Sequence, residues 1–198
     1  MYLNGNSLGM YHILYQCIFI LINFIDKSNY DKTSLAIKYG AFYMPRIEVK
    51  KEYWRFITAN FVHIDIMHIF MNVYCIYNLG HFFEYLLGTG AYLYLIFISC
   101  LATSGACYYH GKKYAYAYNT VTLGASGIFY GYLGAMIALG ILVGGYFDYM
   151  LQQYIYVILI NVAFTFFNRQ VSKAGHFGGL AGGFLATAML IGCGVWHF

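Results

Sequence analysis

Long uninterrupted runs of apolar residues dominate this chain, and short polar stretches separate them. A helix that crosses the roughly 30 Å of bilayer hydrocarbon needs about 20 predominantly apolar residues. The strands of a membrane barrel would instead show shorter segments in which polar and apolar residues alternate. The pattern therefore predicts an all-α membrane protein, built as a bundle of six transmembrane helices. The predicted spans cover approximately residues 8–25, 64–87, 90–109, 123–145, 149–168 and 174–196.

The first run is expected to be a retained span rather than a signal peptide. No basic segment precedes residues 8–25, and no cleavage-type pattern of small residues follows them. The single proline, Pro45, lies outside all six runs, so no predicted span needs a proline kink. A chain of 198 residues is expected to form one domain, here a single membrane domain over residues 1–198.

The composition supports lipid as the main solvent. The chain is 61% hydrophobic and only 9% charged, whereas soluble domains carry about 25% charged residues. The net charge of +4 is dispersed and forms no basic helix stripe, so no nucleic-acid partner is expected. The five cysteines all lie in apolar runs without C-x-x-C spacing, which is typical of small buried side chains.

The basic residues all fall in the odd-numbered connections between the predicted spans. By the positive-inside rule, those connections would lie in the cytoplasm. The first connection, residues 26–63, is the longest and mixes charged with apolar residues, so it is expected to contain structure of its own at the membrane interface. There Trp54 would anchor the segment, while Arg55 would face water or lipid headgroups.

Ser126 stands between small residues at the start of an apolar run, in the stretch TLGASGIFYG. It is expected in the first turn of a helix, where backbone N–H groups have no intrahelical partners. Gly124 and Gly127 would let another backbone or a substrate approach closely. A nucleophile beside free N–H donors suits acyl transfer, with the donors forming an oxyanion hole. The alternative is that these small residues serve helix packing alone.

His176 opens the last run within KAGHFGGLAGGF, where overlapping G-x-x-x-G patterns surround it. Such patterns favour backbone contact with another small-faced helix, and the run at 123–145 carries glycines of its own. Both runs are even-numbered and enter the bilayer from the same side, so packing would bring Ser126 and His176 together. The sequence therefore predicts a Ser–His dyad. No aspartate in the spans is placed to orient His176, and a full triad is not predicted.

His68 and Asn72 lie four residues apart in HIFMN, on one face of the second predicted span. They would enter the bilayer from the same side as Ser126, and their side-chain N–H groups suit a developing oxyanion. The alternative is a polar contact between helices. A zinc site is not predicted, because His63 and His68 are not at i, i+4 and no third ligand is evident.

Together these features resemble the rhomboid intramembrane serine proteases, over nearly the whole chain. Five motifs stand in the order expected for that family. They are YWRF with Trp54 and Arg55, HIFMN with His68 and Asn72, GHFFEYLLG with Glu84, GASG with Ser126, and GHFGG with His176.

The resemblance implies a role for each residue that matches a motif. Ser126 would be the nucleophile and His176 the general base. The oxyanion would be bound by His68, Asn72 and the N–H group of Ser126, with a further N–H from Ala125. Supporting roles fall to Tyr130, which would stack on the histidine, and to Gly127 and Gly124. The structural residues would be Trp54, Arg55, Glu84 and His63. The short loop 168–175 would cap the site, and the run at 149–168 would border the access route for substrate.

The function implied is that of a serine endopeptidase cleaving transmembrane segments of membrane proteins, with lipids as neighbours and with no metal or cofactor. A rhomboid-like protein that binds membrane clients without cleaving them is the alternative. A transporter or channel is not favoured, because the spans carry no paired charges or broken helices at mid-membrane. The first loop resembles bacterial members, which implies a multi-pass protein of a bacterial plasma membrane. The family usually opens its site to the outer face, opposite to the orientation that the charges predict.

Overall fold

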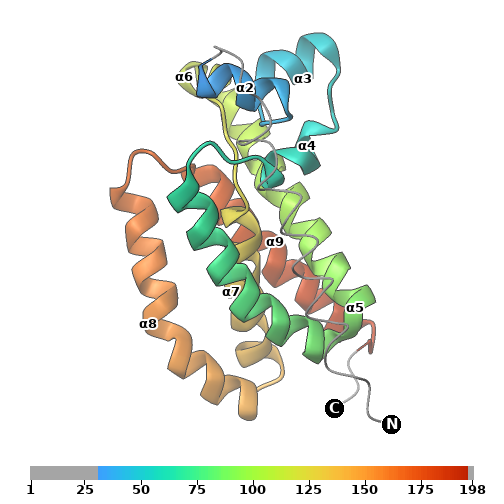
Figure 1. Cartoon of the computed structure of the whole chain (residues 1–198). Helices are drawn as coiled ribbons and strands as arrows, with labels where there is room; N and C mark the ends of the chain where they lie inside the picture. The colour runs from blue at the N-terminus through green and yellow to red at the C-terminus, as the bar shows by residue number, and fades with distance from the viewer. Residues whose placement is uncertain (1–30, 196–198) are drawn as a thin grey trace.

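The computed structural model of the chain describes residues 31–195, and the predicted span at 8–25 lies outside this part. The described residues are helical, contain no β-strand, and include one isolated bridge between Phe42 and Thr122. Figure 1 shows the long helices side by side below a cap of short ones. The elements are α2 (Lys32–Lys38), α3 (Met44–Lys50), α4 (Arg55–Thr58), η1 (Ala59–Phe61), α5 (Ile66–Lys113), α6 (Ala115–Tyr118), α7 (Ser126–Leu142), α8 (Tyr146–Phe167) and α9 (Lys173–Gly192).

α5 consists of two helical parts joined at Gly88, whose φ of 72° and ψ of 157° interrupt the helix. The chain reverses direction there, with the green part of α5 running down and the lime part running back up in Figure 1. This break matches the boundary predicted between the runs at 64–87 and 90–109. Glu84, predicted to be structural, is buried and accepts a hydrogen bond from the Thr89 hydroxyl at 3.1 Å. It therefore joins the two sides of the turn.

The all-helical membrane architecture is confirmed, whereas the six-span count stays a prediction. Among the described residues, α5, α8 and α9 are long and apolar enough to cross a membrane. α7 has only 17 residues, or about 26 Å at 1.5 Å per residue. Most of α7 is buried among the other helices, so the helix lies inside the bundle. The extent of the single domain over residues 1–198 also stays a prediction.

Close backbone contact between α7 and α9 forms the centre of the molecule. The carbonyl oxygen of Gly131 lies where a side chain on Gly183 would project, and the carbonyl of Gly127 faces Gly179 in the same way. The second part of α5 packs against α9 as well, with Ala102 and Ala106 next to Gly178 and Gly182. The predicted packing of two glycine-rich faces is confirmed, and the contact pairs show that α7 and α9 run in the same direction.

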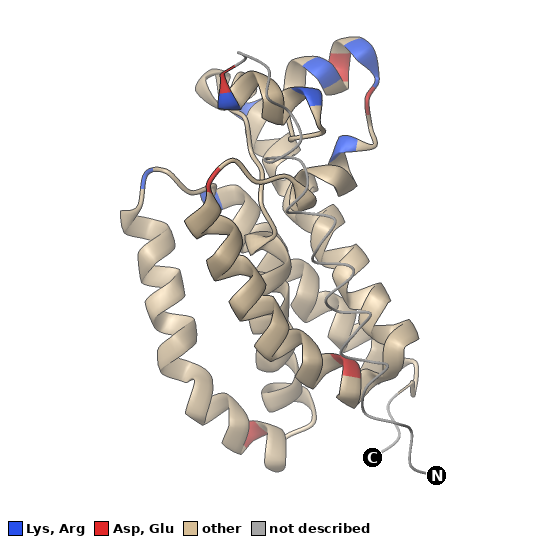
Figure 2. Ribbon diagram, in the orientation of Figure 1, with Lys and Arg blue, Asp and Glu red and all other residues tan. Residues whose placement is uncertain are grey.

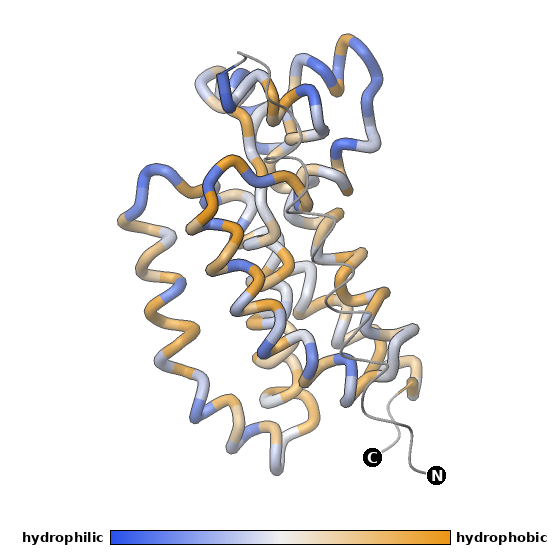
Figure 3. Tube along the Cα trace, viewed as in Figure 1, coloured by the Kyte–Doolittle hydropathy of each residue, from blue (hydrophilic) through white to orange (hydrophobic). Residues whose placement is uncertain are grey.

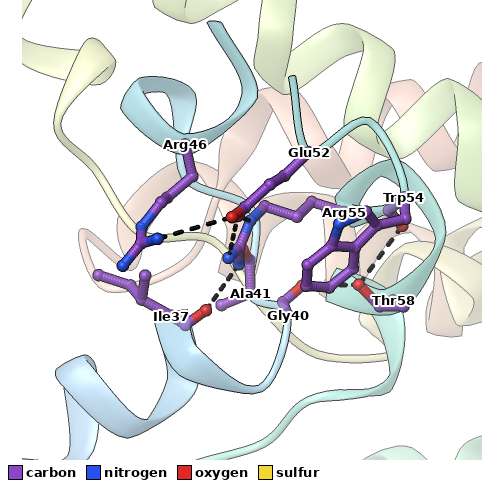
Figure 4. Close-up of polar contacts among 8 residues, drawn as sticks. All are labelled: Ile37, Gly40, Ala41, Arg46, Glu52, Trp54, Arg55 and Thr58. Carbon is purple, nitrogen blue, oxygen red and sulfur yellow. Dashed lines mark hydrogen bonds and ion pairs between the residues drawn. The ribbon is translucent and has the colours of Figure 1, made fainter. Parts of the chain in front are cut away.

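The first connection folds into α2, α3, α4 and η1, and a buried arginine holds it together (Figure 4). Arg55 is 2% exposed and donates hydrogen bonds to Glu52 and to the carbonyl oxygens of Ile37 and Ala41. The Trp54 ring lies 4.5 Å from its guanidinium group. The expectation that Arg55 faces water or headgroups is therefore wrong, because its N–H groups find acceptors within the connection.

Charge is distributed unevenly between the two ends of the described part. Figure 2 shows Lys and Arg gathered at the end that carries α2–α4, whereas acidic residues occur at both ends. In Figure 3 the hydrophilic colour is dense over α3 and in the loop between α8 and α9. Glu48 of α3 pairs with Lys112 near the end of α5 at 2.7 Å, which fastens the cap to the long helices. α7 and α9 both begin at this basic end.

We predict that Gly183→Ala lowers the free energy of unfolding by about 1–3 kcal/mol, because the added methyl group would overlap the Gly131 carbonyl. Gly105→Ala is the matched control, since Gly105 lies in a helix with open space at its Cβ position. That change should be neutral or stabilising by about 0.5–1 kcal/mol. Unfolding of the detergent-solubilised protein measures both. Equal stability of the two variants would contradict the proposed backbone contact.

Candidate active site

The segment that leads to Ser126 is pinned by the first connection. Thr122 exchanges two backbone hydrogen bonds with Phe42, at 2.8 and 3.0 Å, and the Gly124 N–H donates to the Ala59 carbonyl at 2.9 Å. The helix α7 then begins at Ser126 itself. The serine is therefore the first residue of a short, enclosed helix, beside backbone N–H groups that a helix start leaves without intrahelical partners.

His176 lies in the first turn of α9, where the Ser172 hydroxyl caps the helix by accepting from the Gly175 N–H at 3.1 Å. The imidazole is buried at 5% exposure. Its Nε2 lies 2.9 Å from the Ser126 Oγ, within hydrogen-bond distance. The structure therefore brings together the two residues of the predicted dyad, and it does so through the parallel packing of α7 and α9.

A set of contacts from α7 and α8 surrounds the other side of the His176 ring. The Tyr130 ring stacks on it, with centroids 4.2 Å apart and an interplanar angle of 18°. The His176 Nδ1 lies 2.8 Å from the Thr165 Oγ1. The Tyr130 hydroxyl contacts the same Oγ1 and donates to the Asn161 carbonyl at 2.6 Å. Both edges and one face of the imidazole are therefore held.

His68 and Asn72 lie beside the segment that precedes Ser126. Gly124 has a φ of +106°, and a Cβ there would stand 2.6 Å from the His68 ring and 3.6 Å from the Asn72 amide nitrogen. Glycine therefore permits both the backbone conformation and the close approach. With Ser126 and His176, these two side chains line one cavity of about 1080 Å³.

His63 connects this wall of the cavity to the segment before the serine. Its Nε2 accepts a hydrogen bond from the Asn72 amide at 2.9 Å and another from the Ala125 N–H at 3.2 Å. The Ala125 N–H is therefore engaged and directed at His63, which corrects the expectation that it is a further oxyanion donor. Burial, with a smaller contribution from His68, lowers the pKa of His63 to about 4. The ring is neutral near pH 7, as an acceptor must be.

The loop before α9 and the helix α8 also contribute to the cavity lining. Residues 168–172 of the loop, the first residues of α9 and Phe164 of α8 are among the lining residues. The roles of the loop as a cap and of α8 as the border of the access route stay predictions. Within residues 31–195, no group of three or more His, Cys, Asp or Glu side chains is arranged to hold a metal ion.

Sequence reasoning passed over Thr165 and Asn161. Both are polar residues in an otherwise aromatic and aliphatic run, spaced i, i+4 on one helix face. They lie near the end of the span that leads directly into the His176 helix, which places them on the same side of the membrane as Ser126. This spacing of two polar residues is the sequence signal that points to a polar contact near His176.

Comparison with known proteins agrees with the motifs. A family model described as the Rhomboid domain matches residues 50–193, well over half of the chain. The chain is 32% identical over 140 residues to the rhomboid protease GluP of Bacillus subtilis, covering 70% of this chain and 26% of that protein. It is 32% identical over 161 residues to RHOMBOID-like protein 5 of Arabidopsis thaliana, covering 74% of this chain and 47% of that protein. It is 26% identical over 186 residues to Rhomboid-like protease 1 of Toxoplasma gondii, covering 88% of this chain and 58% of that protein.

The chain belongs to the rhomboid family and is an integral membrane protein. It spans between 26% and 58% of the length of these relatives.

We predict that acid destabilises the protein through His63. Its pKa is lowered in the folded state, so the unfolded chain binds the extra proton and stability falls as the pH drops from about 6.5 towards about 4. The loss attributable to this group should reach up to about 3 kcal/mol. His63→Gln keeps an acceptor near the Nε2 position without titrating in this range. Unfolding measured across this pH range should show a shallower dependence in the variant, and identical slopes would contradict the assignment.

Proposed function

We propose that this member of the rhomboid family is an intramembrane serine endopeptidase that cleaves transmembrane segments of other membrane proteins. One observation carries the proposal: the Ser126 Oγ and the His176 Nε2 lie 2.9 Å apart, at the starts of two parallel helices and on the wall of one cavity. A nucleophile within hydrogen-bond reach of a base is the minimal requirement for acyl transfer by a hydroxyl.

In the proposed reaction, His176 Nε2 takes the proton of the Ser126 hydroxyl as Oγ attacks the scissile carbonyl carbon. The carbonyl oxygen becomes an oxyanion, and the His176 imidazolium then donates the proton to the leaving amine nitrogen as the peptide bond breaks. An acyl-enzyme on Ser126 remains. Water, deprotonated by the same Nε2, hydrolyses this ester and restores the hydroxyl.

The proposed oxyanion donors are the Ser126 N–H and the side chains of His68 and Asn72. One N–H of the Asn72 amide donates to His63, which sets the orientation of the amide, and the second N–H is left for a ligand. The His68 ring lies against Gly124, directly before the serine. Donors held in this way need no reorganisation when charge develops on the substrate, which is what makes an oxyanion hole effective.

The proposed substrates are transmembrane helices, and lipids surround the protein. A helical substrate protects its scissile bond with its own hydrogen bonds, so it must unwind locally, and small or helix-destabilising residues near the cut are favoured. The proposed location is a bacterial plasma membrane. The relative from Bacillus subtilis is consistent with this location, while the relatives from Arabidopsis thaliana and Toxoplasma gondii show that the family extends beyond bacteria. The family's usual orientation would open the cavity to the outer face.

A rhomboid-like protein that binds clients without cleaving them is the less well supported alternative. Such a protein needs the cavity but has no use for a serine hydroxyl placed on a histidine nitrogen, or for an aromatic ring stacked on that histidine. These contacts favour the protease.

We predict that the purified protein cleaves a model transmembrane substrate and is labelled by a fluorophosphonate probe. Ser126→Ala should abolish both, and His176→Ala should reduce cleavage by a factor of about 10⁴ or more. Gel-based cleavage and probe fluorescence measure the two effects. Ser34→Ala, in exposed α2 at the edge of the cap, is the control that should keep both. Cleavage that persists in Ser126→Ala would refute the assignment.

A further inference from the structure

We propose that Thr165 is a positioning residue that holds His176 in the tautomer needed for general-base catalysis. The proposal rests on the proposed function. To accept the serine proton at Nε2, the neutral imidazole must carry its own proton on Nδ1. The Nδ1 lies 2.8 Å from the Thr165 Oγ1, an atom that can accept this N–H. Thr165 thus takes the place of the orienting group in a catalytic triad.

The polar groups around Thr165 decide which way its hydroxyl proton points. Thr165 donates to the Asn161 carbonyl at 3.0 Å, and the Tyr130 hydroxyl donates to the same carbonyl at 2.6 Å. A carbonyl oxygen has two lone pairs and no proton, so it accepts both hydrogen bonds and gives none back. With its proton directed at Asn161, the Thr165 Oγ1 presents a lone pair to His176.

The two neutral tautomers of His176 differ in the number of hydrogen bonds that they allow. With the proton on Nδ1, His176 donates to the Thr165 Oγ1 and Thr165 donates to the Asn161 carbonyl. The Tyr130 hydroxyl donates its one proton between that carbonyl and the Thr165 Oγ1, which makes three bonds. With the proton on Nε2, Thr165 must turn its only proton to Nδ1, so the bond from Thr165 to Asn161 is lost. The productive tautomer is therefore favoured by one buried hydrogen bond. A bond of this kind corresponds to about a tenfold preference.

Burial makes this preference effective. Thr165 is 0% exposed, Tyr130 2% and His176 5%, so water does not replace the lost partner. Packing alone does not account for a threonine here, because a valine has nearly the same shape. On α8, which exposes most of its apolar side chains, the buried hydroxyl is placed where the histidine needs an acceptor.

The experiment compares Thr165→Val with Thr165→Ser in detergent, using cleavage of a model transmembrane substrate. Thr165→Val keeps the volume and removes the acceptor, so kcat should fall about tenfold while KM stays within about twofold of the wild type. Thr165→Ser keeps the oxygen and should retain kcat within about threefold. Thr187→Val removes another fully buried hydroxyl, one without a hydrogen-bond partner among the described residues, and should leave kcat unchanged.

The outcomes separate this proposal from the proposed function. A wild-type protein that neither cleaves nor binds the fluorophosphonate probe overturns the protease assignment. An active wild type with an equally active Thr165→Val variant overturns only the role of Thr165. An equal loss in Thr165→Ser and Thr165→Val also overturns it, because the hydroxyl that Thr165→Ser retains would then make no difference. Should Thr165→Val fail to fold, Thr165→Cys provides a side chain of similar size with a weak acceptor and should also lower kcat.

A second measurement needs no change at Thr165. In wild-type protein with ¹⁵N-labelled histidine, the His176 signals, assigned by their loss in His176→Ala, report which ring nitrogen carries the proton near pH 7. We expect the proton on Nδ1. A wild-type ring protonated on Nε2 would overturn the proposal whatever the kinetics show.

Discussion

The contact between the backbones of α7 and α9 is the constraint on which the site depends. Gly127 and Gly131 on one helix meet Gly179 and Gly183 on the other, so the helix axes approach more closely than side chains would allow. The side chains of Ser126 and His176 are short and have few rotatable bonds. They meet at 2.9 Å only because the two helices that carry them are this close and begin at the same end.

A second constraint acts on the segment before Ser126, which belongs to no helix. Backbone hydrogen bonds from Phe42 and Ala59, together with the His63 ring, hold it at three successive points. All three partners belong to the first connection or to its junction with α5, and the buried Arg55 ties part of that connection together (Figure 4). The charged cap is thus coupled mechanically to the start of α7. Arg55 itself donates to Ile37, Ala41 and Glu52, so its contacts lie within the first connection.

The sequence was sufficient to predict the helical class, the break near Gly88 and the pairing of the α7 and α9 glycines, because each leaves a local signature in composition or spacing. Contacts that depend on helix rotation had no such signature. The bond between Ala125 and His63, and the meeting of Thr165 with His176, need the final orientation of three or more segments. The prediction for Arg55 was wrong for a related reason. A charged residue near an interface is expected to lie in water, and only the folded connection shows the carbonyl groups that accept its hydrogen bonds.

Among the residues that the structure describes, the His176 ring contacts hydroxyl groups and no carboxylate, which accords with where the histidine lies. An ionised aspartate in this buried position, within a membrane protein, would lose hydration worth several kcal/mol. A threonine hydroxyl loses far less, and the Asn161 carbonyl, which accepts from both the Thr165 and the Tyr130 hydroxyls, aligns it. Such a neutral acceptor stabilises an imidazolium less than a charge would. The arrangement therefore favours correct orientation of the base over strong electrostatic stabilisation, which suits a site enclosed by apolar helices.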